Sequence, residues 1–264
     1  MEKYEIIDFH THPFMLDEHN ICVHTTRDKM TTNDIKPYFE SLGISKICGS
    51  VVYNFSRQTE LGCDSFDSFR RLNDTALELR EMLGDFYVPG FHINPLFYEE
   101  SCREIERMDS LGVKLVGELV PYLHGWDDFA SDSFSALVDE IERRGMILNI
   151  HTMNDDSLDK LVETHPDAVI VAAHPGDFGA FTRQMNRMAM SKNYYVDVSG
   201  SGLFRFGLLR EGIDRFGADR FLFGSDYPIC TPSMFIGGVA YDPLITEDEK
   251  KLILAHNAKR LLGI

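Results

Sequence analysis

The chain has 264 residues, of which 44% are hydrophobic and 11% are aromatic, and its formal net charge is -16 at pH 7. This composition supports a large packed core and excludes a disordered chain. The 42 acidic residues exceed the 26 basic ones, which argues against a nucleic-acid partner, because phosphate contacts need clustered Lys and Arg.

No linker-like composition divides the sequence, so we expect a single domain over residues 1–264. The first residues lack the basic and apolar regions of a signal peptide, and no run approaches the roughly 18 apolar residues that span a membrane. The five cysteines are scattered and form no Cys-x-x-Cys motif. We therefore expect a cytoplasmic protein with reduced thiols and no membrane partner.

Short apolar runs alternate with amphipathic helical patterns along the chain, and several runs are rich in β-branched residues, as in strands buried on both faces. The spacing of apolar residues over 69–83 is typical of a helix, and Thr246 followed by Glu249 is a capping-box pattern for the last helix. The predicted strands are 5–12, 46–53, 87–94, 113–119, 146–152, 168–174, 194–199 and 220–226.

Eight strand–helix units are the number that closes a parallel (β/α)8 TIM barrel, which typically has about 250 residues. The helix-to-strand connections are short, whereas long strand-to-helix connections occur at 13–31, 54–64, 120–131 and 227–245. Long loops on one side indicate that the C-terminal face of the barrel carries the active site. The alternative is an open doubly wound sheet, but no Gly-x-Gly-x-x-Gly motif follows the first strand.

Polar side chains occur near the ends of five predicted strands. His10 and His12 are two residues apart on an extended segment, so their imidazoles point to the same side and can bind one metal ion. In a parallel barrel such strand ends meet at one mouth, and nitrogen and carboxylate ligands suit zinc and similar ions. The full candidate set is His10, His12, Glu118, His151, His174 and Asp226.

Each of these residues alone is also compatible with a structural role. His151 or His174 could be a buried histidine bonded to a carbonyl, Asp226 could cap the next segment, and Glu118 could pair with Lys114. Their joint position at the strand ends favours a shared metal site. Substrate-binding residues are expected in the long loops, with Arg57 as the preferred anion-binding residue, together with Tyr122 and His124.

With these features the sequence resembles the amidohydrolase superfamily, and specifically its amidohydrolase-related (amidohydrolase-2) branch. The resemblance covers the whole chain and implies a metal-dependent hydrolase. By position, His10 and His12 match the strand-one metal pair, His151 the strand-five ligand and His174 the strand-six histidine, while Asp226 matches the aspartate that binds metal and transfers protons. The segments that carry the resemblance are 6–12, 148–152, 171–176, 195–199, 221–228 and 257–262.

Strand four departs from the family pattern. Many superfamily members with two metals have a carboxylated lysine there, whereas this chain has Lys114 early in the strand and Glu118 near its end. The Val-Gly-Glu-Leu sequence resembles the strand of TatD-type nucleases in which a glutamate bridges two metals. We therefore expect one or two divalent ions per chain. Zinc is the expected metal, and manganese, iron and nickel are the alternatives.

The leading functional prediction is hydrolysis of a small amide, ester or lactone by metal-activated water. Asp226 would transfer the proton, and the metal or His174 would polarise the carbonyl. The alternative is a non-oxidative decarboxylase, which a single metal would favour and a bridging Glu118 would disfavour. A TatD-like nuclease conflicts with the acidic charge, and a metal-binding protein without turnover has no need of Asp226. We expect a small-molecule substrate, and the pattern is compatible with a homo-oligomer.

Overall fold

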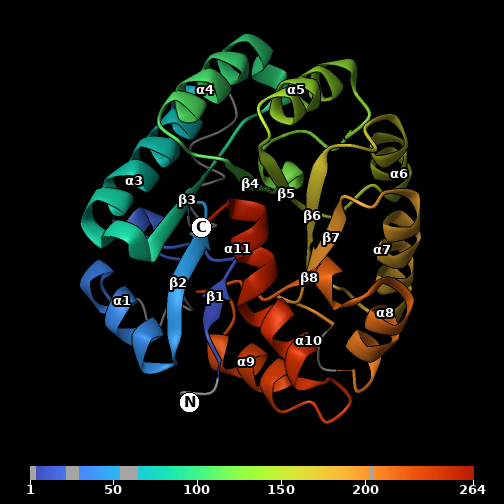
Figure 1. Ribbon diagram of the computed structural model, residues 1–264. Helices are drawn as coiled ribbons and strands as arrows, with labels where there is room; N and C mark the ends of the chain where they lie inside the picture. The colour runs from blue at the N-terminus through green and yellow to red at the C-terminus, as the bar shows by residue number, and fades with distance from the viewer. Residues whose placement is uncertain (1–3, 22–29, 54–64, 203–204) are drawn as a thin grey trace.

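The computed structural model describes residues 4–21, 30–53, 65–202 and 205–264 (Figure 1). Eight parallel strands form one sheet in sequence order, and each pairs with the next. Every predicted strand overlaps an observed one. The strands are β1 (Ile6–Asp8), β2 (Ile44–Gly49), β3 (Tyr87–Phe91), β4 (Leu115–Leu119), β5 (Ile147–His151), β6 (Val169–Ala173), β7 (Tyr194–Asp197) and β8 (Phe221–Leu222).

Backbone contacts also join the last strand segment to the first. The amide of Phe9 donates to the carbonyl of Phe223 over 2.9 Å, and the amide of Asp226 donates to the carbonyl of His10 over 2.8 Å. Thr11 forms a further parallel bridge with Tyr227. The sheet therefore curls back on itself, and the predicted (β/α)8 barrel is confirmed.

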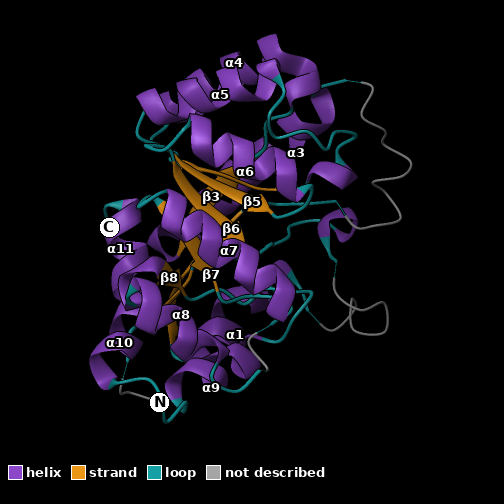
Figure 2. Cartoon of the chain, turned by 90° about the vertical axis from the view of Figure 1, so that its right-hand side faces the viewer, coloured by secondary structure: helices purple, strands orange, loops and turns teal. Residues whose placement is uncertain are grey.

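Helices surround the strands, as Figures 1 and 2 show. Short 3-10 turns link several elements, and a π-helical turn (Leu252–His256) runs into the last helix. The α-helices are α1 (Thr32–Ser41), α3 (Asp67–Leu83), α4 (Tyr98–Ser110), α5 (Asp132–Arg143), α6 (Asp155–Thr164), α7 (Phe178–Met190), α8 (Leu208–Phe216), α9 (Pro232–Ala240), α10 (Glu247–Lys251) and α11 (Asn257–Leu262). No described helix is long and apolar enough to cross a membrane.

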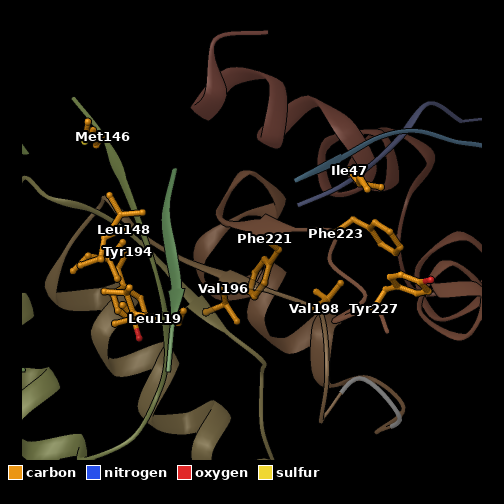
Figure 3. Packing of buried hydrophobic residues seen from close by; sticks show 14 of the residues in the cluster. Ile47, Leu119, Met146, Leu148, Tyr194, Val196, Val198, Phe221, Phe223 and Tyr227 are labelled. Atoms are coloured by element: carbon orange, nitrogen blue, oxygen red, sulfur yellow. The ribbon is translucent and has the colours of Figure 1, made fainter. Parts of the chain in front are cut away.

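The apolar core has two parts. The larger cluster joins side chains of the strands to those of the surrounding helices, and Figure 3 shows part of it, with Leu148, Val196 and Phe221 among the labelled residues. The smaller cluster joins side chains from seven strands or their extensions to Ala255 and Ala258 of the C-terminal helical segment. The first part attaches the helices to the barrel, and the second fills its interior.

The C-terminal helix covers the N-terminal end of the barrel. The Asn257 side chain donates to the carbonyls of Ala218 over 2.8 Å and Phe221 over 2.7 Å, at the start of β8. In Figure 1 α11 accordingly lies over the middle of the strands. This end is closed by packed side chains, so the opposite end is free to carry a site.

Several strands end earlier than predicted, and β1, β2 and β8 each end four residues early. The predicted strand 220–226 includes an observed ladder of only Phe221–Leu222. Beyond it the chain leaves regular pairing, because Asp226 adopts a left-handed backbone with φ 60 while its amide bonds to His10. The final residues of the predicted strand thus form the rim of the barrel rather than its wall.

The last helical segment begins as predicted. The hydroxyl of Thr246 accepts the amide of Glu249 over 3.4 Å, and the carboxylate of Glu249 accepts the amide of Thr246 over 2.8 Å, so the capping box is confirmed. Arg210 of α8 also donates to Glu249 over 2.8 Å. These hydrogen bonds, of which the one from Arg210 has the largest effect, lower the pKa of Glu249 to about 2.

We predict that Glu249→Gln lowers the melting temperature at pH 7 by about 1–3 °C, the range expected for an exposed ion pair with a cap. Because the folded-state pKa lies below the unfolded value of about 4.3, this stabilisation is present above that pH and is lost as the pH falls toward 2. Thermal melts from pH 7 to pH 2 measure it. Glu78→Gln on the exposed face of α3 is the control, and an equal effect of both variants would contradict the prediction.

Candidate metal centre

The six predicted metal ligands lie together at the C-terminal end of the barrel. They come from five strands or from the residues that follow them; His10, His12, Glu118 and Asp226 are buried, whereas His151 and His174 are partly exposed. Groups of their nitrogen and oxygen atoms lie within 4.8 Å of one another. These predicted ligands are His10 and His12 after β1, Glu118 on β4, His151 at the end of β5, His174 after β6 and Asp226 after β8.

Glu118 lies at the centre of this group, and its two carboxylate oxygens face different histidines. Oε2 is 3.3 Å from Nε2 of His10 and 3.3 Å from Nε2 of His12. Oε1 is 3.0 Å from Nδ1 of His151 and 3.7 Å from Nε2 of His174. One carboxylate is therefore shared between two pairs of imidazoles.

The backbone before Glu118 approaches β5 too closely for any side chain. Gly117 has φ 100, and a Cβ at this position would lie 2.1 Å from the carbonyl oxygen of Asn149. Only glycine fits this contact and this conformation without strain. Gly117 thus allows β4 to press against β5 where Glu118 enters the centre.

Two of the histidines are held so that their lone pairs face inward. Nδ1 of His12 lies 3.0 Å from the carbonyl of Ser50, and Nδ1 of His10 lies 2.8 Å from Oδ2 of Asp197. Both partners accept hydrogen bonds, so each Nδ1 carries a proton and each Nε2 is left as the atom that can bind a metal ion. Those two Nε2 atoms are 3.3 Å apart and face Oε2 of Glu118.

Three acceptor atoms at such distances repel one another unless a cation lies among them. Nitrogen and carboxylate donors in this arrangement suit a divalent ion such as zinc, which binds His nitrogen at about 2.0–2.1 Å and carboxylate oxygen at about 2.0–2.2 Å. The second set, Glu118 with His151 and His174, offers a similar trio. The residues present therefore fit a metal centre.

The charges of the buried groups are consistent with this interpretation. Burial opposes the charge of Glu118, but His10, His12 and His151 outweigh it and hold the pKa of Glu118 well below its ordinary value. Burial also opposes the charge of His10, yet Asp197 and Glu118 raise the pKa of His10 well above its ordinary value, so these carboxylates favour a positive charge between them, which a proton supplies when no metal ion is bound. Glu118 is thus ionised in the folded protein, as a metal ligand must be.

Asp226 faces the same trio from the other side. Its Oδ1 lies 3.6 Å from Nε2 of His12 and 3.8 Å from Nε2 of His10. Burial raises the pKa of Asp226 above its ordinary value, although the nearby histidines oppose this. Asp226 and His174 both have a left-handed backbone, with φ 60 and φ 68, which costs of order 1 kcal/mol or more for a non-glycine residue.

A cavity of about 280 Å³ opens onto the centre. One side of it consists of the ligands His12, Glu118, His151, His174 and Asp226. The other side is mainly apolar or aromatic and includes Ile21, Val52, Tyr53, Val120, Tyr122, Leu123 and Ile229. Such a cavity suits a small organic molecule whose reacting group points at the ligands.

The predicted substrate-binding residues occupy different places. Tyr122 lines the cavity, and its ring lies 5.6 Å from that of His151. His124 is buried between Phe69 and His92 with ring distances of 5.0 and 5.3 Å, and it is not among the described residues that line the cavity. That position argues against direct substrate contact. Arg57 lies outside the described residues.

Two residues without a predicted role also lie at this centre. Asp197 ends β7 and Ser199 follows it, and both are fully buried against His10 and His174. The available signal was their spacing, because polar residues two apart at the end of a strand repeat the arrangement of His10 and His12.

The amidohydrolase family model matches residues 7–264. This chain belongs to the amidohydrolase family. The match spans nearly the whole sequence, including all six predicted ligands. No match was found among curated protein sequences.

Solved structures of the same fold include both decarboxylases and hydrolases. 2,6-Dihydroxybenzoate decarboxylase from Rhizobium superposes with a TM-score of 0.76 at 15% identity, over 98% of this chain and 99% of that chain. Dihydroxybenzoic acid decarboxylase from Polaromonas sp., with bound manganese and an inhibitor, gives 0.73 at 14% identity over 98% and 97%. A protein from Acinetobacter baumannii assigned as a 2-pyrone-4,6-dicarboxylic acid hydrolase gives 0.68 at 15% identity over 98% and 100%. At these identities the likeness shows the fold alone.

We predict that Gly200→Ala weakens metal binding by about tenfold or more, since displaced supporting groups typically cost this amount. Gly200 has φ 59, and a Cβ there would lie 2.2 Å from Nδ1 of His174, so the imidazole must move. Metal affinity is measured by competition with a chromogenic chelator. The control is Gly237→Ala on α9, where a Cβ meets nothing within 4 Å. Unchanged affinity in Gly200→Ala would contradict the prediction.

Proposed function

We propose that this amidohydrolase is a metal-dependent hydrolase of a small amide, ester or lactone, with two divalent ions that share Glu118. The observation that carries the proposal is the division of the Glu118 carboxylate, with Oε2 facing His10 and His12 and Oε1 facing His151 and His174. A carboxylate with a pair of imidazoles at each oxygen supplies three donor atoms to each of two positions. Two-metal hydrolytic centres place their ions about 3.5–4 Å apart, a separation that a bridging carboxylate suits.

The bound ions would supply an activated water at neutral pH and polarise the carbonyl to be attacked. Asp226 is placed to transfer the proton. It lines the cavity, lies within 3.8 Å of both β1 histidines through Oδ1, and has a raised pKa. A carboxylate with these properties can accept a proton from the attacking water and return it to the leaving group.

Zinc is the metal that we propose, with manganese, iron and nickel as alternatives. Ring nitrogens and carboxylates without cysteine are compatible with all four. The bound manganese in the Polaromonas decarboxylase, a protein of the same fold, supports a divalent ion in this chain. The cavity walls favour a small substrate with an apolar body, which Tyr122 would contact.

The second candidate function is non-oxidative decarboxylation of a small carboxylic acid. It is favoured by the fold shared with 2,6-dihydroxybenzoate decarboxylase, which covers 98% of this chain. A decarboxylase of this kind would need one metal rather than two. The number of ions bound per chain therefore separates the two candidates before any substrate is known.

We predict that the purified protein binds two equivalents of zinc and that Glu118→Gln binds one or fewer, because an amide presents only one oxygen and no charge. Elemental analysis and titration with zinc give the stoichiometry. The exposed Glu163→Gln on α6 is the matched control and should retain two equivalents. One tightly bound ion in the wild-type chain would refute the two-metal centre and favour the decarboxylase.

We predict that Asp226→Asn lowers kcat by about 10²–10⁴-fold on the best amide, ester or lactone substrate, the usual contribution of a positioned proton-transfer group. A substrate panel with parallel detection of acid release and of carbon dioxide identifies the reaction. Asp127→Asn, on the exposed loop after β4, should retain full activity. Carbon dioxide release from a carboxylic acid without any hydrolytic turnover would establish the second candidate instead.

A further inference from the structure

Asp197 and Ser199 lie at the end of β7 and contact one metal ligand on each side of Glu118. Oδ2 of Asp197 lies 2.8 Å from Nδ1 of His10, and Oγ of Ser199 lies 2.9 Å from Nδ1 of His174. Oγ of Ser199 is also 3.0 Å from Nδ1 of His10. The two residues thus connect a histidine that faces Oε2 of Glu118 with one that faces Oε1.

The proton positions in this network follow from the chemical groups. An ionised carboxylate only accepts hydrogen bonds, so the proton between His10 and Asp197 belongs to Nδ1 of His10. Oδ1 of Asp197 accepts the backbone amides of Ser199 over 3.0 Å and His174 over 3.2 Å, together with the Ser199 hydroxyl. Because that hydroxyl donates its single proton to Asp197, its bond with His174 requires a proton on Nδ1 of His174.

Nδ1 of both imidazoles therefore holds a proton, which leaves Nε2 of each ring as the atom that can bind a metal ion. In each case Nε2 is the atom that faces Glu118, at 3.3 Å for His10 and 3.7 Å for His174. Metal-bound histidines need this arrangement, in which the second ring nitrogen donates to a protein group.

Close packing prevents either ring from turning away. A Cβ at Gly200 would lie 2.2 Å from Nδ1 of His174, and a Cβ at Gly224 would lie 2.8 Å from Cβ of His10. Backbone therefore fills the space beside the His174 ring and beside Cβ of His10. The amide of His174 also donates to Asp197, which ties the left-handed turn at His174 to the same carboxylate.

We infer that Asp197 and Ser199 are positioning residues that hold the Nδ1 proton and the orientation of His10 and His174 before any metal binds. This inference deepens the proposed function and rests on its metal centre, but it makes a separate claim about the metal-free protein. Because the Ser199 hydroxyl contacts a ligand on each side of Glu118, its loss should weaken both metal positions rather than one.

The test combines tautomer measurement with metal affinity. In the metal-free full-length protein, imidazole nitrogen chemical shifts should show Nδ1 protonation for both His10 and His174. In Ser199→Ala, His174 should become a mixture of tautomers. In Asp197→Asn, the amide can donate to Nδ1 of His10 and should favour the reversed tautomer. Each variant should bind zinc about 10–100-fold more weakly in chelator competition.

Two further variants separate positioning from general destabilisation. Ser199→Thr keeps the hydroxyl and should restore the tautomer of His174 and the affinity for zinc. Ser191→Ala, just before β7, removes a buried hydroxyl that donates to the carbonyl of Pro166 over 2.8 Å and should leave both readouts unchanged. The inference is overturned if Ser199→Ala and Asp197→Asn keep the wild-type tautomers and bind zinc as tightly as Ser191→Ala. If the tautomers are fixed but the chain binds only one ion, the two-metal proposal is overturned, whereas the positioning role of Asp197 and Ser199 stands.

Discussion

The mutual repulsion of buried acceptor atoms is the constraint on which this site depends. Nε2 of His10, Nε2 of His12 and Oε2 of Glu118 lie 3.3 Å from one another, with little water to screen them. In a medium of low dielectric such an arrangement is costly unless a cation compensates it. The rest of the fold must therefore hold the three atoms in place, and a barrel whose strands end at one mouth can do so.

The supporting structure is rigid where this is needed. Strands β4 and β5 are in backbone contact at Gly117, and the helical segment before α11 joins the filling of the barrel interior. The left-handed residues His174 and Asp226 are held by hydrogen bonds of their amides to Asp197 and His10. Local strain at ligand positions is thus offset by the packing and bonding around them, as is common at functional sites.

Sequence patterns predicted the parts of this structure that depend on periodicity. The alternation of short apolar runs with amphipathic helical patterns identified all eight strands. The His-x-His spacing placed His10 and His12 side by side, because side chains on an extended segment point to the same side at every second residue. The same reasoning failed where the chain leaves regular pairing. The end of β8 was placed four residues too late, since the turn at Asp226 depends on a bond to His10 that is distant in sequence.

The direction of side chains in loops was the other feature that could not be predicted from the sequence. Tyr122 and His124 are two residues apart in one loop, yet Tyr122 lines the cavity whereas His124 packs behind its wall against Phe69 and His92. Nothing local in the sequence distinguishes them, because the 3-10 turn at Pro121–Leu123 decides which ring faces inward. Asp197 was likewise overlooked although its spacing from Ser199 repeats that of His10 and His12, because its contact with Nδ1 of His10 joins residues that are distant in sequence.

Charge balance gives an independent reason to favour two ions at the centre. Three buried carboxylates, those of Glu118, Asp197 and Asp226, contact the histidines of the cluster. If all three carboxylates are ionised, one divalent ion leaves the centre with a net negative charge beside an apolar cavity wall. This charge disfavours the approach of an electron-rich carbonyl oxygen and of a carboxylate substrate. Two divalent ions leave a net positive charge, which stabilises the oxyanion that develops when a carbonyl is attacked. This charge balance supports the two-metal hydrolase that we propose rather than the release of carbon dioxide at a single metal.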